Sequence, residues 1–294
     1  MINKYPINSD YSNLKTYVIN LDDYKTNYVK QLPYLLNIGL QVERFSGINA
    51  LKNEHEKPEY KQHISNYAKN FAPKSVIGCA LSHILCCKYI KSKYNEKTTA
   101  QMPFFLIMED DAFPLYNKEE FYEHLNKSLY EIKLLDSNWD FIQLHSDCIL
   151  PTKDTYSTHI ACGSTAAYLI SYNAVNKMLT SKIFGHLDFI QHNFIKYNKY
   201  RTKENLFYTN EKDSLNRLEV KNKLNYKYYS LLLKSKFCEL LNYYTHIIPL
   251  RGEKKYQHFL EFKVFKEPFL EKEFNTNDLL DYFFTFIILR KILT

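Results

Sequence analysis

Three consecutive acidic residues, Glu109, Asp110 and Asp111, directly follow the apolar run FFLIM at 104–108. Two unpaired carboxylates 4 Å apart repel one another by about 4 kcal/mol at an effective dielectric constant near 20. If the backbone stays extended, Glu109 and Asp111 point to one face and Asp110 to the other. A divalent cation removes the repulsion, and such oxygen ligands suit Mn²⁺ or Mg²⁺ held together with a substrate diphosphate. The alternative is an acidic cluster that only faces solvent.

The predicted order of strands and helices places these acids at the edge of a sheet. The apolar run at 104–108 is typical of a central strand that is buried on both faces. Other strands are predicted at 16–21, 41–50, 140–145, 165–171 and 206–209, and helices at 24–38, 75–93, 118–135, 174–180 (capped by Asn173) and 188–197. Residues 52–74 are predicted to be a loop or an irregular insert. This alternation predicts an α/β fold with a mixed, mostly parallel central sheet flanked by helices, in which ligands bind beyond the carboxyl ends of the strands.

Several other enzyme classes are excluded by missing motifs. The six glycines form neither GxGxxG nor GxxxxGK[ST], so the chain has no glycine-rich loop for a dinucleotide or a nucleotide phosphate. There is no GxSxG, and EDDAF does not supply the DxDx[TV] pattern of a phosphatase with an aspartate nucleophile. The six cysteines form no CxxC, and several lie in apolar runs, which is typical of a reducing compartment.

The formal charge of +7 makes an anionic partner plausible, whether a nucleotide, a lipid surface or a nucleic acid. Most of the positive charge is lysine, and arginine, which reads guanine and clamps phosphate, is scarce, so no nucleic-acid partner is expected. The first residues lack the apolar segment of a signal peptide, and no apolar run is long enough to span a bilayer. These features predict a cytoplasmic protein with, at most, a peripheral membrane contact through its lysine- and aromatic-rich end.

An ordered set of motifs resembles glycosyltransferase family 25, the enzymes of lipooligosaccharide biosynthesis and collagen galactosylation. The segments that carry the resemblance lie between about residues 15 and 217: VINLDDYKTN, ERFSGINA, GCALSHILCCKYI, FFLIMEDDAFP, GSTAAYLISYNAVNKML and GHLDFIQHN. The resemblance implies a GT-A-type fold at 1–217, to which we add a mainly helical extension at 218–294. It also implies an inverting enzyme that uses a divalent metal and a UDP-sugar.

The resemblance assigns roles to individual residues of this sequence. Asp111 and Glu109 would bind Mn²⁺ or Mg²⁺, with Asp111 as the direct ligand and Asp110 near the ribose or a metal-bound water. Asn20 and Leu21 would lie beside the uridine, and Ser82 and His83 would border the donor pocket. The family often carries an arginine shortly after the first strand, where this chain has KTNYVK, so Lys25 or Lys30 would have to substitute as a point charge.

Inversion by a single displacement requires a general base that accepts the proton of the acceptor hydroxyl. Asp188 is the first candidate and Asp147 the second. Gly163 and Ser164 are candidates for the acceptor side, and His186 for a further ligand. Each also has an ordinary structural explanation: Asp188 as a helix-terminal acid, the Gly163-Ser164 pair as a turn, and His83 as a buried, hydrogen-bonded helix residue.

The sequence therefore predicts a glycosyltransferase that moves a galactose- or glucose-type hexose from a UDP-sugar to a glycan or glycoprotein acceptor. Two alternatives remain at this point. One is a non-catalytic module of similar fold that binds a sugar or nucleotide. The other is a basic protein that binds a lipid surface or a nucleic acid.

Overall fold

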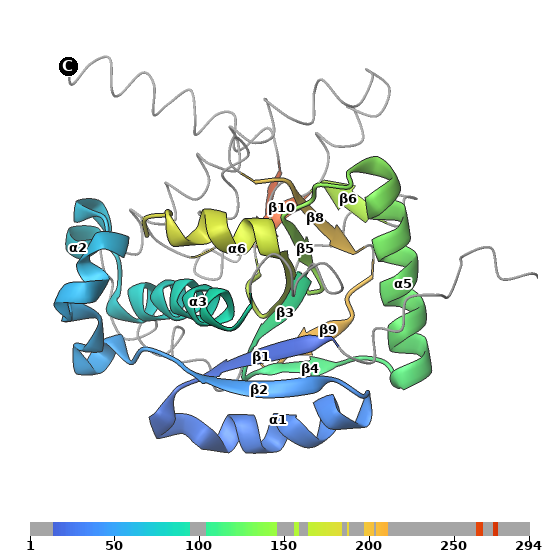
Figure 1. Ribbon diagram of the computed structural model, residues 1–294, viewed down its shortest axis with the longest axis horizontal. Coiled ribbons are helices and arrows are strands. Elements are labelled where there is room, and N and C mark those ends of the chain that lie inside the picture. The colour runs from blue at the N-terminus through green and yellow to red at the C-terminus, as the bar shows by residue number, and fades with distance from the viewer. Residues whose placement is uncertain are drawn as a thin grey trace, which may run out of the picture. The chain divides into compact units, whose positions relative to one another are not determined.

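The computed structural model describes residues 14–94, 104–145, 156–158, 164–183, 187, 197–202, 204–210, 263–266 and 273–275 (Figure 1). These residues fall in two compact units. The first comprises 1–159 and 163–231, and the second 160–162 and 232–294. The predicted boundary at 217 and the predicted helix at 188–197 lie outside the described residues, apart from Tyr197.

A seven-stranded sheet forms the centre of the first unit, with the strand order β2-β1-β3-β7-β5-β8-β6. The strands β1, β2, β3, β5 and β8 run in one direction, and β6 and β7 run in the other. The predicted mixed, mostly parallel sheet is thus confirmed. The strands are Lys15–Asn20 (β1), Gln41–Ser46 (β2), Phe104–Glu109 (β3), Phe141–Gln143 (β5), Tyr156–Thr158 (β6), Ala167–Ser171 (β7) and Lys199–Thr202 (β8). A separate antiparallel pair joins Ala112–Pro114 (β4) to Phe207–Thr209 (β9).

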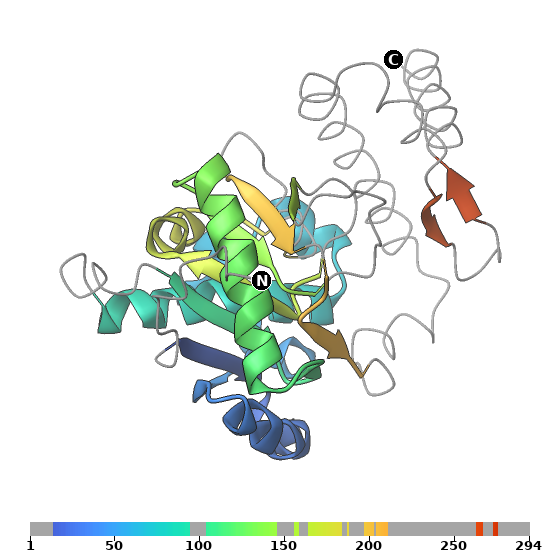
Figure 2. The same ribbon diagram turned by 90° about the vertical axis from the view of Figure 1, so that its right-hand side faces the viewer.

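The helices cover both faces of the sheet (Figures 1 and 2). The helices α3 and α6 pack on one face, and α1 and α5 on the other; Figure 2 shows α5 in front of the strands. Their bounds are Lys25–Asn37 (α1), Asn66–Phe71 (α2), Lys74–Lys93 (α3), Lys118–Leu135 (α5) and Tyr172–Leu179 (α6). No helix of the described residues is long and apolar enough to cross a membrane.

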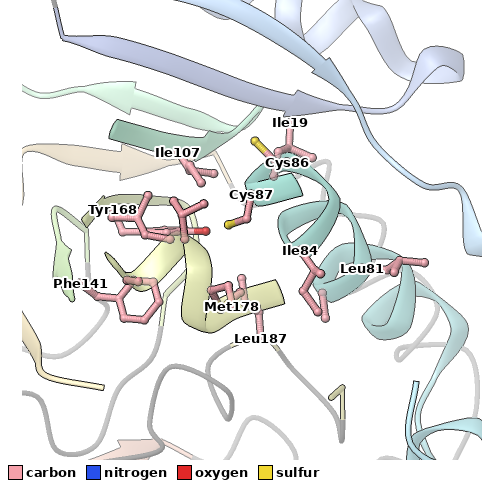
Figure 3. Packing of buried hydrophobic residues seen from close by; sticks show 14 of the residues in the cluster. Ile19, Leu81, Ile84, Cys86, Cys87, Ile107, Phe141, Tyr168, Met178 and Leu187 are labelled. Carbon is pink, nitrogen blue, oxygen red and sulfur yellow. The ribbon is translucent and has the colours of Figure 1, made fainter. Parts of the chain in front are cut away.

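The core has two layers because side chains of a buried strand alternate between the faces of the sheet. In β3, Phe105 and Ile107 pack toward α3 and α6, where Ile84, Cys87 and Met178 meet them (Figure 3). Phe104, Leu106 and Met108 point the other way and pack against α1 and α5. The run at 104–108 is therefore a central strand covered on both faces, as its sequence predicts.

Local signals in the sequence account for several helix ends. Helix α1 ends before Gly39, whose φ of 80° lies in the left-handed region that glycine adopts most easily. Helix α5 begins after Asn117, whose side chain accepts a hydrogen bond from the amide of Glu120 at 3.0 Å. Helix α6 begins two residues earlier than predicted, because Ser171 and not Asn173 accepts the capping bond from Ala174 at 3.1 Å.

The segment 52–74, predicted to be a loop or an irregular insert, is instead mostly helical. Its residues form three short 3₁₀ helices, Ala50–Lys52 (η3), Glu54–Glu56 (η4) and Pro58–His63 (η5), followed by α2 and the start of α3. Ser65 caps α2 by accepting a hydrogen bond from the amide of Ala68 at 3.0 Å, and Ala68 is fully buried. A capping serine thus starts a helix within a segment whose composition is mostly polar.

The second unit contributes two described strands. Lys263–Lys266 (β10) and Glu273–Asn275 (β11) pair antiparallel, with Phe265 opposite Phe274. The remainder of the predicted helical extension at 218–294 lies outside the described residues.

Candidate functional site

A pocket opens where the neighbouring parallel strands β1 and β3 end. Ile19 of β1 pairs with Glu109 of β3, so Asn20 and the acidic residues leave the sheet at the same edge. The pocket encloses about 860 Å³, its open mouth included.

The pocket brings together residues that lie far apart in the sequence. Residues predicted to bind the donor or a metal line its wall: Asn20, Leu21, Ser82, His83, Glu109, Asp110 and Asp111. The rest of the wall comes from the start of α1, the turn after β2 and the start of α3: Tyr24, Asn27, Ile48, Asn49, Ala50, Leu51, Ser75 and Cys79, with Ile19.

The three acids do not follow the alternation expected of an extended strand. Strand β3 ends at Glu109, and the backbone turns at Asp110 and Asp111 before β4 begins. A Glu109 carboxylate oxygen accepts a hydrogen bond from the hydroxyl of Thr165, and Asp110 accepts one from the amide of Asn20. Because of the turn, Glu109 and Asp110 have different hydrogen-bond partners.

Burial raises the pKa of both aspartates. It raises the pKa of Asp110 to about 6, with a further contribution from the charge of Glu109. It raises the pKa of Asp111 to about 7, and the charges of Glu109 and Asp110 raise it further. Asp111 Oδ1 is buried and has no hydrogen-bond partner among the described residues. A buried, unpartnered carboxylate oxygen beside two other acids fits a divalent cation with oxygen ligands.

Helix α1 supports the acidic turn through Gln31. This side chain is fully buried, and its amide donates to the carbonyl oxygens of Glu109, at 2.9 Å, and of Ala112. Two carbonyls on either side of the turn therefore share one donor group. Gln31 fixes the path of the backbone between β3 and β4.

Arg44 of β2 fixes the end of β1. Its Nε donates to the Asn20 side-chain oxygen at 2.8 Å, and one terminal nitrogen donates to the Asn20 carbonyl at 3.1 Å. The same nitrogen forms an ion pair with Asp22 at 2.7 Å. Since Arg44 engages the oxygen of the Asn20 amide, the nitrogen is left to donate to Asp110. Neither Lys25 nor Lys30 is among the residues that line the pocket, and the arginine near Asn20 comes from β2 instead.

Close packing fixes the wall formed by α3. A Cβ atom added to Gly78 would lie 2.8 Å from the carbonyl oxygen of Ile48, so the turn after β2 approaches α3 as closely as glycine permits. Ser82 accepts a hydrogen bond from the amide of Ile48 at 2.8 Å and donates to the Gly78 carbonyl at 2.6 Å. Ser82 therefore joins two walls of the pocket, a structural role in addition to its place in the lining.

The remaining predicted site residues are spread over other parts of the chain. The base candidates Asp188 and Asp147, together with Gly163 and His186, lie outside the described residues. Ser164 does not line the pocket; its carbonyl accepts a hydrogen bond from Gln143 at 2.7 Å. It precedes Thr165, which contacts Glu109.

Sequence reasoning missed Gln31, Arg44 and Thr165. For Gln31 a signal was present: it lies one turn before Leu35, and these two are the buried residues of α1, so a polar residue occupies the apolar stripe of that helix. Arg44 and Thr165 lie in ordinary strand and turn positions. Their contacts depend on which strands become neighbours.

An acid-lined pocket at the carboxyl edge of an α/β sheet is typical of an enzyme site. The chain belongs to glycosyltransferase family 25, whose members are described as LPS biosynthesis proteins. The family model matches residues 13–184, more than half of the 294 residues. The protein is therefore a glycosyltransferase, an enzyme that transfers a sugar from a donor to an acceptor. No curated protein matches the chain.

Proposed function

We propose that this glycosyltransferase transfers a galactose- or glucose-type hexose from a UDP-sugar to a glycan or glycoprotein acceptor, with inversion and with Mn²⁺ or Mg²⁺. The observation that supports the proposal best is the buried Asp111 oxygen, which has no hydrogen-bond partner among the described residues and lies in a pocket with two further acids. Such a site is unfavourable for a bare diphosphate and favourable for a diphosphate bound to a cation.

The walls of the pocket suggest how the donor lies. Asn20 and Leu21 would flank the uridine, and Asp110, held by Asn20, would face the ribose side. Asp111 and Glu109 would hold the metal, which supplies charge neutralisation to the departing diphosphate. In this assignment Gln31 and Arg44 keep the two strand ends in register, so that the nucleotide and the acids meet in one place.

The displacement requires a base on the acceptor side. The acceptor hydroxyl attacks the anomeric carbon, the bond to the diphosphate breaks, and the proton passes to a carboxylate. Asp188 is our first candidate and Asp147 the second. Measuring transfer in Asp188→Ala and Asp147→Ala separates them, since loss of turnover with unchanged UDP affinity identifies the base.

Calorimetry with UDP in the presence and absence of Mn²⁺ tests the donor assignment. We expect UDP to bind with Mn²⁺ and to bind at least ~10-fold more weakly in excess chelator, because the acids then repel the diphosphate. Asp111→Asn should remove the effect of Mn²⁺. Full transfer in excess chelator would contradict the metal-dependent mechanism, and UDP binding without turnover of any UDP-sugar would favour a non-catalytic module.

A further inference from the structure

A second group of potential ligands lies in the pocket beside the acidic turn. Cys79 and His83 are one turn apart on α3, and Glu109 faces them from the end of β3. One atom of each, the thiol sulfur, an imidazole nitrogen and a carboxylate oxygen, all lie within 4.8 Å of one another. Glu109 Oε1 is 3.6 Å from His83 Nε2 and 4.0 Å from Cys79 Sγ.

The strongest indication of a ligand comes from His83. Its side chain is fully buried, and its Nε2 has no hydrogen-bond partner among the described residues. At 3.6 Å the contact of Nε2 with Glu109 is too long for an N–H···O hydrogen bond. A buried nitrogen aimed at a carboxylate but not bonded to it leaves room for a cation between them.

Neighbouring groups orient two of the three potential ligands. His83 Nδ1 lies 2.8 Å from the hydroxyl of Tyr168, a fully buried residue of β7 whose hydroxyl points toward α3 (Figure 3). When Nδ1–H donates to that hydroxyl, the lone pair of Nε2 faces Glu109. The hydroxyl of Thr165 in turn donates to Glu109. Metal-binding histidines and carboxylates in proteins are commonly held by outer partners of this kind.

The chemistry of the three side chains selects the metal. Thiolate, imidazole and carboxylate are the ligands of Zn²⁺, and three protein ligands leave a fourth tetrahedral position for water or a substrate oxygen. Mg²⁺ and Mn²⁺ prefer oxygen ligands and do not favour a thiolate. We propose that Cys79, His83 and Glu109 bind one Zn²⁺ ion in the wall of the donor pocket, with Glu109 shared between this ion and the cation proposed at Asp111.

Cobalt(II) tests this site without any sugar donor, because a cobalt–thiolate bond gives a near-ultraviolet charge-transfer absorption. The full-length protein, stripped of metal by a chelator, is titrated with Co²⁺ and then with Zn²⁺. We expect the absorption to reach its maximum at one equivalent and to disappear when Zn²⁺ displaces the cobalt. Absence of a cobalt–thiolate spectrum in the wild type would overturn the proposal and leave a plain contact between His83 and Glu109.

Two substitutions on α3 form a matched pair. Cys79→Ser should abolish the absorption, whereas Cys87→Ala, which removes a fully buried thiol two turns along the same helix, should preserve it. Glu109→Gln should weaken cobalt binding by at least ~10-fold. Thermal unfolding of each variant checks that the fold persists. A charge-transfer band that survives in Cys79→Ser would place the thiolate elsewhere and refute the site.

The same titration separates this site from the proposed transfer reaction. Asp111→Asn should keep the cobalt–thiolate spectrum, because Asp111 is not one of the three ligands. If that variant keeps the spectrum while UDP binding by the wild-type protein proves indifferent to Mn²⁺, the zinc site stands and the metal-dependent donor mechanism fails. If the spectrum is absent while Mn²⁺ supports UDP binding, only the zinc proposal fails.

Discussion

Gln31 of α1 donates a 2.9 Å hydrogen bond to the carbonyl of Glu109, the residue at which β3 ends and the acidic turn begins. The same amide also binds the carbonyl of Ala112, where β4 begins. A helix packed on one face of the sheet therefore sets the backbone of a turn whose side chains line the pocket.

Replacing Gln31 by methionine should disturb both stability and the site. Two carbonyls lose their donor, so we expect the free energy of unfolding to fall by about 1–3 kcal/mol. UDP affinity should fall as well, because the turn is no longer fixed. Urea denaturation and calorimetry measure the two effects. The matched control is Gln62→Met, because Gln62 is exposed and its amide makes two long contacts, 3.4 Å to the Glu59 carbonyl and 3.5 Å to a ring nitrogen of His63. Equal effects of both substitutions would contradict a positioning role.

Replacing Arg44 by lysine should weaken UDP binding while the charge remains. Lysine cannot reproduce the two bonds of the guanidinium to Asn20, so the Asn20 amide is free to turn away from Asp110. We expect a Kd for UDP about 3- to 10-fold higher, measured by calorimetry with Mn²⁺ present. Asp22→Asn is the control, since it removes the ion pair with Arg44 and leaves an amide oxygen that can accept the hydrogen bond from the Ser46 hydroxyl. A larger loss of UDP affinity with Asp22→Asn would show that UDP binding depends on the ion pair and not on the bonds to Asn20.

The stability of the metal-free protein should fall as pH rises from about 4 to about 7. In the folded state Asp111 has a pKa near 7 instead of the usual 3.8, so the folded protein holds a proton that the unfolded chain releases in this range. Stability is fully present below the unfolded pKa and is lost as pH rises through the folded pKa, by on the order of 2–4 kcal/mol. Urea denaturation at a series of pH values measures this slope. Asp110 adds in the same direction, because its pKa is also raised.

Two comparisons test the origin of that slope. Asp111→Asn should flatten it, whereas Glu123→Gln, at an exposed position of α5, should leave it unchanged. Mn²⁺ at pH 7 should restore stability in the wild type, because a cation replaces the proton as the partner of the carboxylates. A slope that persists in Asp111→Asn would assign it to other groups.

Adding a methyl group at Gly78 should open the wall between α3 and the turn after β2. The new Cβ would meet the Ile48 carbonyl at 2.8 Å and the Ala50 side chain at 3.0 Å, so the turn must move. We expect Gly78→Ala to lower the free energy of unfolding by about 1–3 kcal/mol despite the better helix propensity of alanine. Lys88→Ala on the exposed face of α3 is the control. If Gly78→Ala instead raised the free energy of unfolding, the turn after β2 would have to move at little cost.

The sequence predicts the sheet and part of the pocket because these features depend on local patterns. The short apolar run at 104–108 is typical of a buried strand, which places the acids that follow it at the sheet edge. The capping serines at 65 and 171 were local signals too, but mostly polar neighbours obscured the first, and Asn173 competed with the second.

Other parts of the site could not be predicted, because they depend on contacts between distant segments. The expectation that Asp110 points away from Glu109 and Asp111 failed, because the backbone turns at Asp110 and all three acids line the pocket. Gln31 from another helix holds that turn. Arg44 reaches Asn20 only because β2 pairs with β1. The short strand β8 was missed, since its sequence KYRT lacks a strong apolar pattern.

The hydrogen bond between Asn20 and Asp110 joins residues 90 positions apart in the chain. The pocket therefore cannot form during synthesis until the third strand has been made, and the proposed donor site requires both segments. Pairing across such a distance is a slow step in folding. Pulse-labelled chains released at successive lengths should thus acquire UDP affinity abruptly, after residue 111 has emerged and paired, and not in gradual increments.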